Sequence, residues 1–427
     1  MEDKGSKTLY LSILMVFLPF IAFLYSVYNI RNVRYHFIIL VFSFLYGYSV
    51  YMYSGDILGY NQTYTEMVHL NAGDFGKIIV SGYIPDKVTS PSLTVHGQPD
   101  IYATSMMFLV SRFTDNSRWF FAIVSLIYTA IFIKFLQEVL KELKWQGNFA
   151  QITFLSFLIL IVPFYVGVTG IRFWTALFLF MLSLMKFIRT KQPKFILLSA
   201  LSVLVHFSFF IPLAVLVLSL IIKVNRRIAT FLIFIAVVFF ALTDNSQVLN
   251  MVSSSSRFFS ESTIESRIEG YSSEDTLAQR QEAEAQGNWY ARLRPKIIFY
   301  ALLAAFLLEY FGILRWQTNE FLERLNSFYI LFVIVVLFTY NFGSMGRFAY
   351  IFYLMTFVRY TVIAGLSSRN GSSLMLSYAL VPILLLHIAV SFRAGFYTVD
   401  PLLAFGNSLS LLLFHSDISL SELLVGH

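Results

Sequence analysis

The sequence contains no cysteine among its 427 residues. Disulfides, thiolate metal sites and cysteine nucleophiles are therefore excluded, although the cellular compartment is left open. Charged residues are also scarce, at 13% of the chain, against roughly 25% in a soluble domain. Aspartate and glutamate are almost absent from the apolar stretches. This absence argues against a transporter coupled to protons or sodium, because such transporters need buried carboxylates.

Several common motifs are missing as well. There is no Walker A loop, no G-x-G-x-x-G, no G-x-S-x-G and no metal-ligand spacing of His and Asp. An ATP-driven pump is therefore not indicated, and we expect no cofactor and no metal. The net charge of +7 does not point to nucleic acid, because Lys and Arg cluster in short loops between apolar runs, as the positive-inside rule requires.

What the sequence does contain is apolar surface. Hydrophobic residues make up 57% of the chain, including 46 Phe and 25 Tyr, and the mean hydropathy is +0.70. These values predict an all-α polytopic membrane protein, one integral membrane domain over 1–427, with about twelve transmembrane helices. The helices are expected at 8–28, 36–53, 118–137, 149–168, 172–188, 228–243, 297–314, 326–342, 347–366 and 374–392, with two short helices between 195 and 222.

Charge in the loops predicts the topology. The basic loops RNVR, KELK, RTKQPK and KVNRR are placed in the cytoplasm. The amino terminus and the long segments 54–117 and 244–296 then lie outside. A short interfacial helix is expected at 100–112, and a polar external helix at SSEDTLAQRQEAEAQ. The stretch around VHFSFFIP must turn as a short helical hairpin, because a single helix there would place KVNRR outside.

The strongest candidate for chemistry is Arg172. It is the only charged residue between Trp145 and Met185, and an arginine in hydrocarbon is costly unless it reaches water or a partner. It could be an arginine whose stem snorkels to the interface. Alternatively, its planar donors could bind phosphate oxygens beside a helix N-terminus, and Gly170 would allow close approach.

Other candidates lie at the same predicted face. His206 could be a packing residue or a general base, and Asp56 a turn aspartate or a second base. Tyr60 and Tyr64 follow Asp56 at helical spacing and could form an aromatic floor for a sugar.

Two further arginines occupy similar positions. Arg347 follows a Gly-Ser-Met-Gly turn and opens a span, as Arg172 opens another. Arg393 ends the last clear helix, where a cation is favourable in any case. We therefore predict that Arg172, Arg347 and Arg393 bind an anion. Arg359, three turns after Arg347, is interpreted as a cytoplasmic snorkel.

At this point the sequence resembles a known family. The stretch GIRFWTALFLFMLSLMKFIRTKQPKFILLSALSVLVHFSFFIPLAVLVLSL is similar to the central signature of Wzy-type polysaccharide polymerases of the EpsG-like branch. GDILGYNQTY, GSMGRFAYIFY and GNSLSLLL are similar to its other elements. One departure is that Val50 stands where many members carry an arginine, so that contact is either missing or supplied elsewhere, for example by Arg118 or Arg393.

The resemblance implies a reaction and a setting. The donor would be an undecaprenyl-pyrophosphate-linked oligosaccharide, transferred with inversion onto another lipid-linked repeat unit at the external face of the bacterial inner membrane. Arg172, Arg347 and Arg393 would bind pyrophosphate, His206 or Asp56 would be catalytic, and Tyr60 and Tyr64 would contact glycan. It also implies a fold related to the GT-C glycosyltransferases, no metal, membrane lipids around the protein and a chain-length regulator as a partner.

Three alternatives stay open. A lipid-linked oligosaccharide flippase would need cations along a cavity that opens to both sides. A membrane acyltransferase would need its histidine at the cytoplasmic face. An O-antigen ligase would differ in its acceptor alone.

Overall fold

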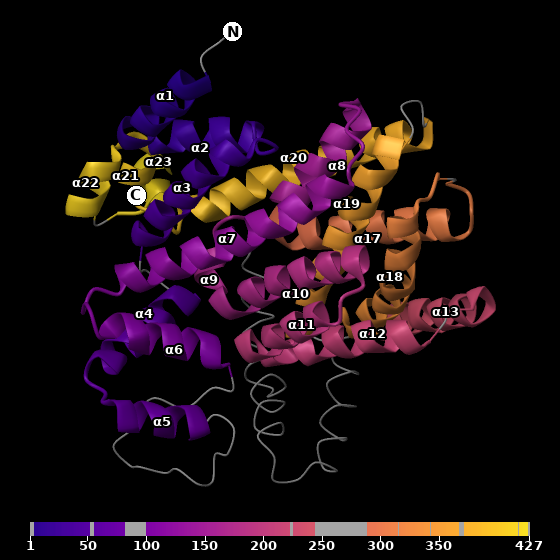
Figure 1. The fold of residues 1–427 in the computed structure, drawn as a ribbon, viewed down its shortest axis with the longest axis horizontal. Coiled ribbons are helices and arrows are strands. Elements are labelled where there is room, and N and C mark those ends of the chain that lie inside the picture. The colour runs from indigo at the N-terminus through magenta and orange to yellow at the C-terminus, as the bar shows by residue number, and fades with distance from the viewer. Residues whose placement is uncertain are drawn as a thin grey trace. The chain divides into compact units, whose positions relative to one another are not determined.

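The protein folds as two compact helical units. The computed structural model describes residues 4–51, 55–81, 100–222, 225–243, 288–314, 316–341, 343–366, 371–416 and 418–425. Their regular structure is helical apart from one isolated bridge between Val50 and Val399 (Figure 1). This confirms the all-α class. The first unit comprises 1–141, 163–210 and 391–427, and the second comprises 142–162 and 211–390.

The first unit is built from the chain's amino-terminal half and its tail. Its longest helices are α7 and α10, and the others are shorter. They are α1 (Lys4–Phe17), α2 (Pro19–Tyr28), α3 (His36–Tyr48), α4 (Gly55–Val68), α5 (Ala72–Ser81), α6 (Ile101–Ser111), α7 (Arg118–Glu142), α9 (Val166–Thr169), α10 (Ile171–Thr190), α11 (Lys194–Val205), α21 (Leu402–Phe405), α22 (Ser408–Leu413) and α23 (Leu420–Val425).

The other helices of the described residues belong to the second unit. They are α8 (Phe149–Leu160), α12 (Phe210–Ile221), α13 (Arg226–Leu242), α17 (Trp289–Tyr310), α18 (Glu320–Thr339), α19 (Ala349–Leu366) and α20 (Gly371–Phe396), the last turn of which belongs to the first unit.

Two helices that were predicted as continuous are interrupted near prolines. The helix expected at 8–28 is two helices, because Pro19 has no N–H to donate and instead stands at the first position of α2. The helix expected at 149–168 stops at Leu160, before Pro163, and resumes only as α9. The short helix expected at 100–112 is confirmed as α6, whereas the polar helix expected after residue 271 falls outside the described residues.

Membrane-spanning length is present in several helices. Among the described residues, five are long and apolar enough to cross a membrane. They are Arg118–Glu142, Ile171–Thr190, Glu320–Thr339, Gly346–Leu366 and Gly371–Phe396. Six further apolar helices are shorter. The number of twelve crossings therefore stays a prediction, while a multi-pass membrane protein is supported.

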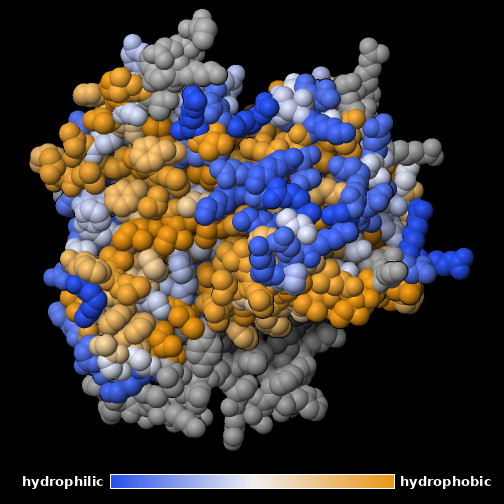
Figure 2. Space-filling model, viewed as in Figure 1, coloured by the Kyte–Doolittle hydropathy of each residue, from blue (hydrophilic) through white to orange (hydrophobic). Residues whose placement is uncertain are grey.

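The outer face of α13 shows why lipid is the natural surrounding. Ile228, Phe231, Ile235, Val238 and Leu242 recur on one face and are all exposed, Leu242 at 75%. The opposite face is buried through Ala229, Ile233 and Ala236. Figure 2 shows hydrophobic surface where α12 and α13 run in Figure 1. A helix that is apolar on its buried and exposed sides alike is typical of a membrane span.

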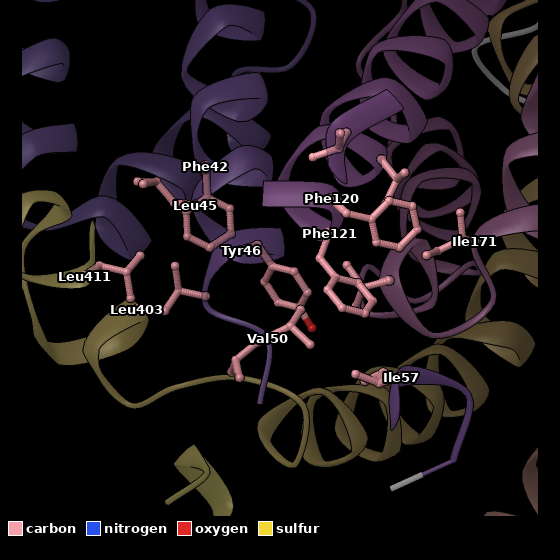
Figure 3. Close-up of a cluster of buried hydrophobic side chains, with 14 of the residues drawn as sticks. Phe42, Leu45, Tyr46, Val50, Ile57, Phe120, Phe121, Ile171, Leu403 and Leu411 are labelled. Carbon is pink, nitrogen blue, oxygen red and sulfur yellow. The ribbon is translucent and has the colours of Figure 1, made fainter. Parts of the chain in front are cut away.

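A hydrophobic core cluster in the first unit draws buried side chains from most of its helices. Side chains from α3, α4, α7, α10, α21 and α22 pack in one cluster (Figure 3). The tail joins this cluster through the Val50–Val399 bridge, and the buried Asp400 accepts hydrogen bonds from the N–H groups of Leu402 and Ser416 at 2.8 and 2.6 Å. Phe42, Leu45, Tyr46, Val50, Ile57, Phe120, Phe121, Ile171, Leu403 and Leu411 are labelled there.

A close contact between α3 and α7 gives a test of this packing. A Cβ added to Gly47 would lie 2.8 Å from Ala122 Cα, and also against the Phe121 carbonyl. We expect Gly47→Ala to destabilise the protein by about 1–3 kcal/mol, because backbone must move apart. Gly59 on α4 has open space around the same position. Gly59→Ala should therefore be neutral or stabilising, by up to about 1 kcal/mol. Thermal unfolding in detergent compares the two variants. Equal melting temperatures for Gly47→Ala and Gly59→Ala would contradict the close contact at Gly47.

Candidate active site

A buried carboxylate, Asp100, organises the candidate site in the first unit. Asp100 stands directly before α6 and is only 2% exposed. Its side chain does not cap that helix. One oxygen, Oδ2, lies 2.8 Å from Arg172 Nη1 and 3.4 Å from His206 Nδ1, and the other accepts the Phe207 N–H at 2.8 Å. One carboxylate thus joins α6, α10 and the turn after α11.

Arg172 is fixed by the start of α10. That helix begins directly after Gly170, so Arg172 lies in its first turn. A Cβ at Gly170 would lie 2.6 Å from the Trp174 ring, so the close approach expected of this glycine is present. The Arg172 side chain is 28% exposed. Asp100 therefore anchors the guanidinium while part of it still faces solvent, next to a helix N-terminus that favours anions.

His206 stands where the apolar stretch bends. α11 ends at Val205, His206 is extended, and a 3-10 turn at Phe207–Phe209 leads into α12. The two short helices predicted here are present as α11 and α12, while their folding as a hairpin stays a prediction. The Phe173 ring meets the imidazole edge to face, with the centroids 5.7 Å apart. With Nδ1 facing Asp100, Nε2 is the nitrogen that can face a substrate.

Electrostatics bind the cluster together. Burial alone would raise the pKa of Asp100, but the neighbouring His206 and Arg172 side chains and the Phe207 N–H outweigh burial and lower it. Asp100 is therefore ionised at neutral pH. Burial raises the pKa of Tyr60 on α4, although the charge of Arg172 and a hydrogen bond with it act in the opposite direction. Tyr60 therefore belongs to the same cluster.

The structure also locates the other residues expected on α4. Asp56 is exposed in the first turn of α4, where the helix dipole favours an anion, and its charge reaches the Tyr60 hydroxyl. Tyr64, expected beside Tyr60 in a glycan floor, is fully buried. Its ring packs against Phe120 and its hydroxyl donates to the Thr114 carbonyl at 2.6 Å. Of the two tyrosines, Tyr60 is therefore the one next to Arg172. Tyr64 instead packs α4 against the start of α7.

The two remaining arginines lie elsewhere in the chain. Arg347 is exposed in the 3-10 turn Gly343–Phe348 of the second unit, directly before α19. Arg393 is exposed in the last turn of α20. Hydrogen bonds from Ser421 and Arg393 lower the pKa of Tyr397. Convergence of Arg172 and Arg347 on one anion stays a prediction.

Asp100 is the site residue that the sequence did not reveal. It lies inside the predicted external segment, and the helix that follows it was expected, but the aspartate itself was not proposed. The available signal was an acidic residue directly before an apolar helix in a chain with few carboxylates. That signal predicts an N-cap, whereas the structure turns the side chain away from its own helix and toward Arg172 and His206.

The comparisons with known proteins identify a family. A model described as the EpsG family matches residues 35–399, which include every candidate residue above. Neither the curated proteins nor the solved structures contain a match.

Proposed function

The chain belongs to the EpsG family, which supports a membrane polysaccharide polymerase, and we propose that it transfers a lipid-linked oligosaccharide onto another lipid-linked repeat unit. The observation that carries this proposal is the buried Asp100, which holds a cation and an imidazole side by side. Glycosyl transfer from a pyrophosphate needs both kinds of group: a cation where negative charge develops, and an acceptor for the proton of the attacking hydroxyl.

Arg172 has the features required of the pyrophosphate-binding group. Its guanidinium is oriented by Asp100 and remains partly exposed beside the N-terminus of α10. As the anomeric C–O bond breaks, charge moves onto the pyrophosphate oxygen, and the planar donors of arginine suit such oxygens. We assign Arg347 and Arg393 to binding the pyrophosphate of the donor or that of the acceptor.

His206 is our choice for the general base. An anionic Asp100 facing Nδ1 favours the tautomer in which Nδ1 carries the proton and Nε2 is free to accept one. The acceptor sugar hydroxyl would lose its proton to Nε2 while its oxygen attacks the anomeric carbon. A single displacement of this kind inverts that carbon. Asp56 is the second candidate base, and Tyr60 a glycan contact.

The finer features of the proposal come from the family resemblance. They are an undecaprenyl carrier, an active site at the external face of the bacterial inner membrane, a GT-C-related architecture, independence from metals and a chain-length regulator as partner. The exposed apolar helices support the membrane setting itself.

The test of this function uses the chain in its own membrane. Cells carrying Arg347→Ala are expected to accumulate lipid-linked single repeat units and to lose the polymer ladder on gels, with the protein level unchanged. The control is Arg292→Ala, an exposed arginine near the start of α17 in the same unit, which should keep the ladder. Long chains in the Arg347 variant would contradict its anion role. If the Arg347 variant still formed polymer but no longer transferred glycan to the lipid A core, the result would indicate a ligase.

A further inference from the structure

A pocket in the second unit lies apart from the residues assigned above. Helices α13, α17, α18 and α19 line this pocket, which has a volume of about 380 Å³. Ligand sites typically measure about 300–1,000 Å³. The pocket lies where α13 and α18 begin and where α17 ends, and the basic loop KVNRR before α13 predicts that this end faces the cytoplasm. It therefore has the volume of a ligand site and is expected at the level of the lipid headgroups.

A buried ion pair forms the inner wall of this pocket. Arg359 is 5% exposed, its Nη2 pairs with Glu309 Oε1, and its guanidinium lies over the Tyr329 ring, 4.7 Å from the centroid. Arg359 was expected to snorkel, so this placement is a correction: the guanidinium turns inward to a carboxylate and an aromatic face. Because the charges of Arg359 and Glu309 neutralise each other, the inner wall favours neither an anion nor a cation.

The charges that a ligand can reach belong to the exposed part of the lining. Arg226 is the first residue of α13, Glu323 lies in the first turn of α18, and both are exposed. Their helices pack against each other, yet within the described residues neither side chain has an ion-pair partner. The Thr318 hydroxyl lies 3.4 Å from Glu323 Oε1. The pocket therefore presents a guanidinium and a carboxylate that do not neutralise each other directly.

Two separate charges of opposite sign favour a zwitterionic ligand. A simple anion would be repelled by Glu323 and a simple cation by Arg226, whereas a zwitterion pairs with both. The guanidinium suits phosphate oxygens, and the N-terminus of α13 adds attraction for an anion. A primary ammonium donates three hydrogen bonds, and Glu323, Thr318 and Asn326 offer acceptors in the same lining. Phosphate and primary ammonium together make a phosphoethanolamine group.

Apolar side chains beside the pocket indicate that this group belongs to a lipid. Ile228 and Phe231 on α13, and Phe311 and Ile313 at the end of α17, are all well exposed. They stand on the two helices whose Arg226 and Tyr310 line the pocket. A polar pocket bordered by exposed apolar surface suits a molecule with a charged head and apolar chains. The bilayer supplies such molecules at the depth where this pocket is expected.

We propose that the pocket binds the headgroup of a phosphatidylethanolamine molecule from the bilayer. The phosphate pairs with Arg226, the ammonium pairs with Glu323, and the acyl chains lie along the exposed apolar face of α13. This site is independent of the proposed polymerase function. Arg359 lies ten residues into α19, whereas Arg347 directly precedes that helix. At about 1.5 Å per residue, the two arginines are separated by roughly 15 Å or more along α19.

Native mass spectrometry of the full chain, delipidated in detergent, tests the proposal. The probes are phosphatidylethanolamine, phosphatidylcholine, phosphatidylglycerol and free phosphoethanolamine, and the bound fraction gives an apparent Kd for each. Phosphatidylethanolamine should bind saturably, and about tenfold more tightly than phosphatidylglycerol, which lacks the ammonium, or free phosphoethanolamine, which lacks the chains. It should bind about threefold more tightly than phosphatidylcholine, whose quaternary nitrogen has no N–H to donate.

Charge variants test whether the lipid lies in this pocket. Arg226→Gln and Glu323→Gln should each weaken phosphatidylethanolamine binding by about fivefold or more, because each removes one charge-assisted contact. Both residues are exposed, so we expect the melting temperature of the lipid-free chain to stay unchanged. The matched controls are Arg227→Gln and Glu320→Gln, which neutralise exposed neighbours on the same two helices that do not line the pocket. Both controls should bind the lipid as the unmodified chain does.

Several results would overturn the proposal. They are the absence of saturable phosphatidylethanolamine binding, equally tight binding of phosphatidylglycerol or phosphatidylcholine, and equal weakening by the pocket variants and their controls. Free phosphoethanolamine that binds as tightly as the lipid would also overturn it, because the acyl chains would then contribute nothing. Because polymer ladders report on Arg172 and Arg347, failure here leaves the polymerase result unaffected.

Discussion

Replacing Arg172 with lysine is expected to abolish long polymer chains while the protein level and the single repeat units remain. Lysine keeps a cation beside Asp100, so the buried carboxylate is not left unpaired, a change that would cost about 3–5 kcal/mol. What is lost is the planar fork that can hold Asp100 and a phosphate oxygen at once. The measurement is the ladder of chain lengths on gels, together with protein abundance in membranes.

This substitution separates a catalytic arginine from a structural one. If Arg172 served only as the partner of Asp100, lysine would preserve the ladder, and that result would contradict the pyrophosphate role. Arg172→Ala should also abolish polymer, but with some loss of protein. Arg189 at the other end of α10 is the matched control: it pairs with Glu138 at 2.9 Å, and Arg189→Lys should leave chain length unchanged.

Removing the imidazole should have an effect of similar size. We expect His206→Ala to lower the rate of polymer formation by about 10²–10⁴-fold, the usual contribution of a general base. Asp100→Asn should lower it at least tenfold, because the neutral amide no longer holds Arg172 and His206 through charge. The rate is measured with purified protein and lipid-linked repeat units.

Two further variants serve as controls for His206→Ala and Asp100→Asn. His69→Ala alters an exposed histidine of the same unit and should be fully active. Asp100→Glu restores the charge and should recover part of the rate, which a merely structural role would not explain if both Asp100 variants are equally stable. Full activity of His206→Ala together with Asp56→Ala would contradict both candidate bases.

Patterns that act along the chain could be predicted from the sequence. Apolar runs between basic loops predicted most helices, and the need to keep KVNRR on the side of the other basic loops predicted a break in VHFSFFIP, where α11 ends and α12 begins. The errors at Pro19 and Pro163 were also local, because the ring removes a donor whatever the hydrophobicity of its neighbours.

Contacts between distant residues could not be predicted in the same way. Asp100 meets Arg172 across 72 positions and the Phe207 N–H across 107. Nothing near Asp100 distinguishes it from an ordinary N-cap, because its role depends on how α6 packs against α10 and α11. Likewise Arg359, predicted to be a snorkelling arginine, is buried in the middle of α19 and pairs through Nη2 with Oε1 of Glu309, which lies 50 positions earlier in the chain.

The buried pair between α17 and α19 has a consequence for biogenesis. Glu309 is synthesised before α18 and α19, so its carboxylate has no Arg359 to pair with while the chain enters the bilayer. An unpaired charge at the centre of a span costs about 2.5–3.5 kcal/mol during insertion, but Glu309 stands one residue from the end of α17, where headgroups and water can solvate it. The carboxylate would then leave the interface only when α19 arrives, which makes docking of that helix a late step of assembly.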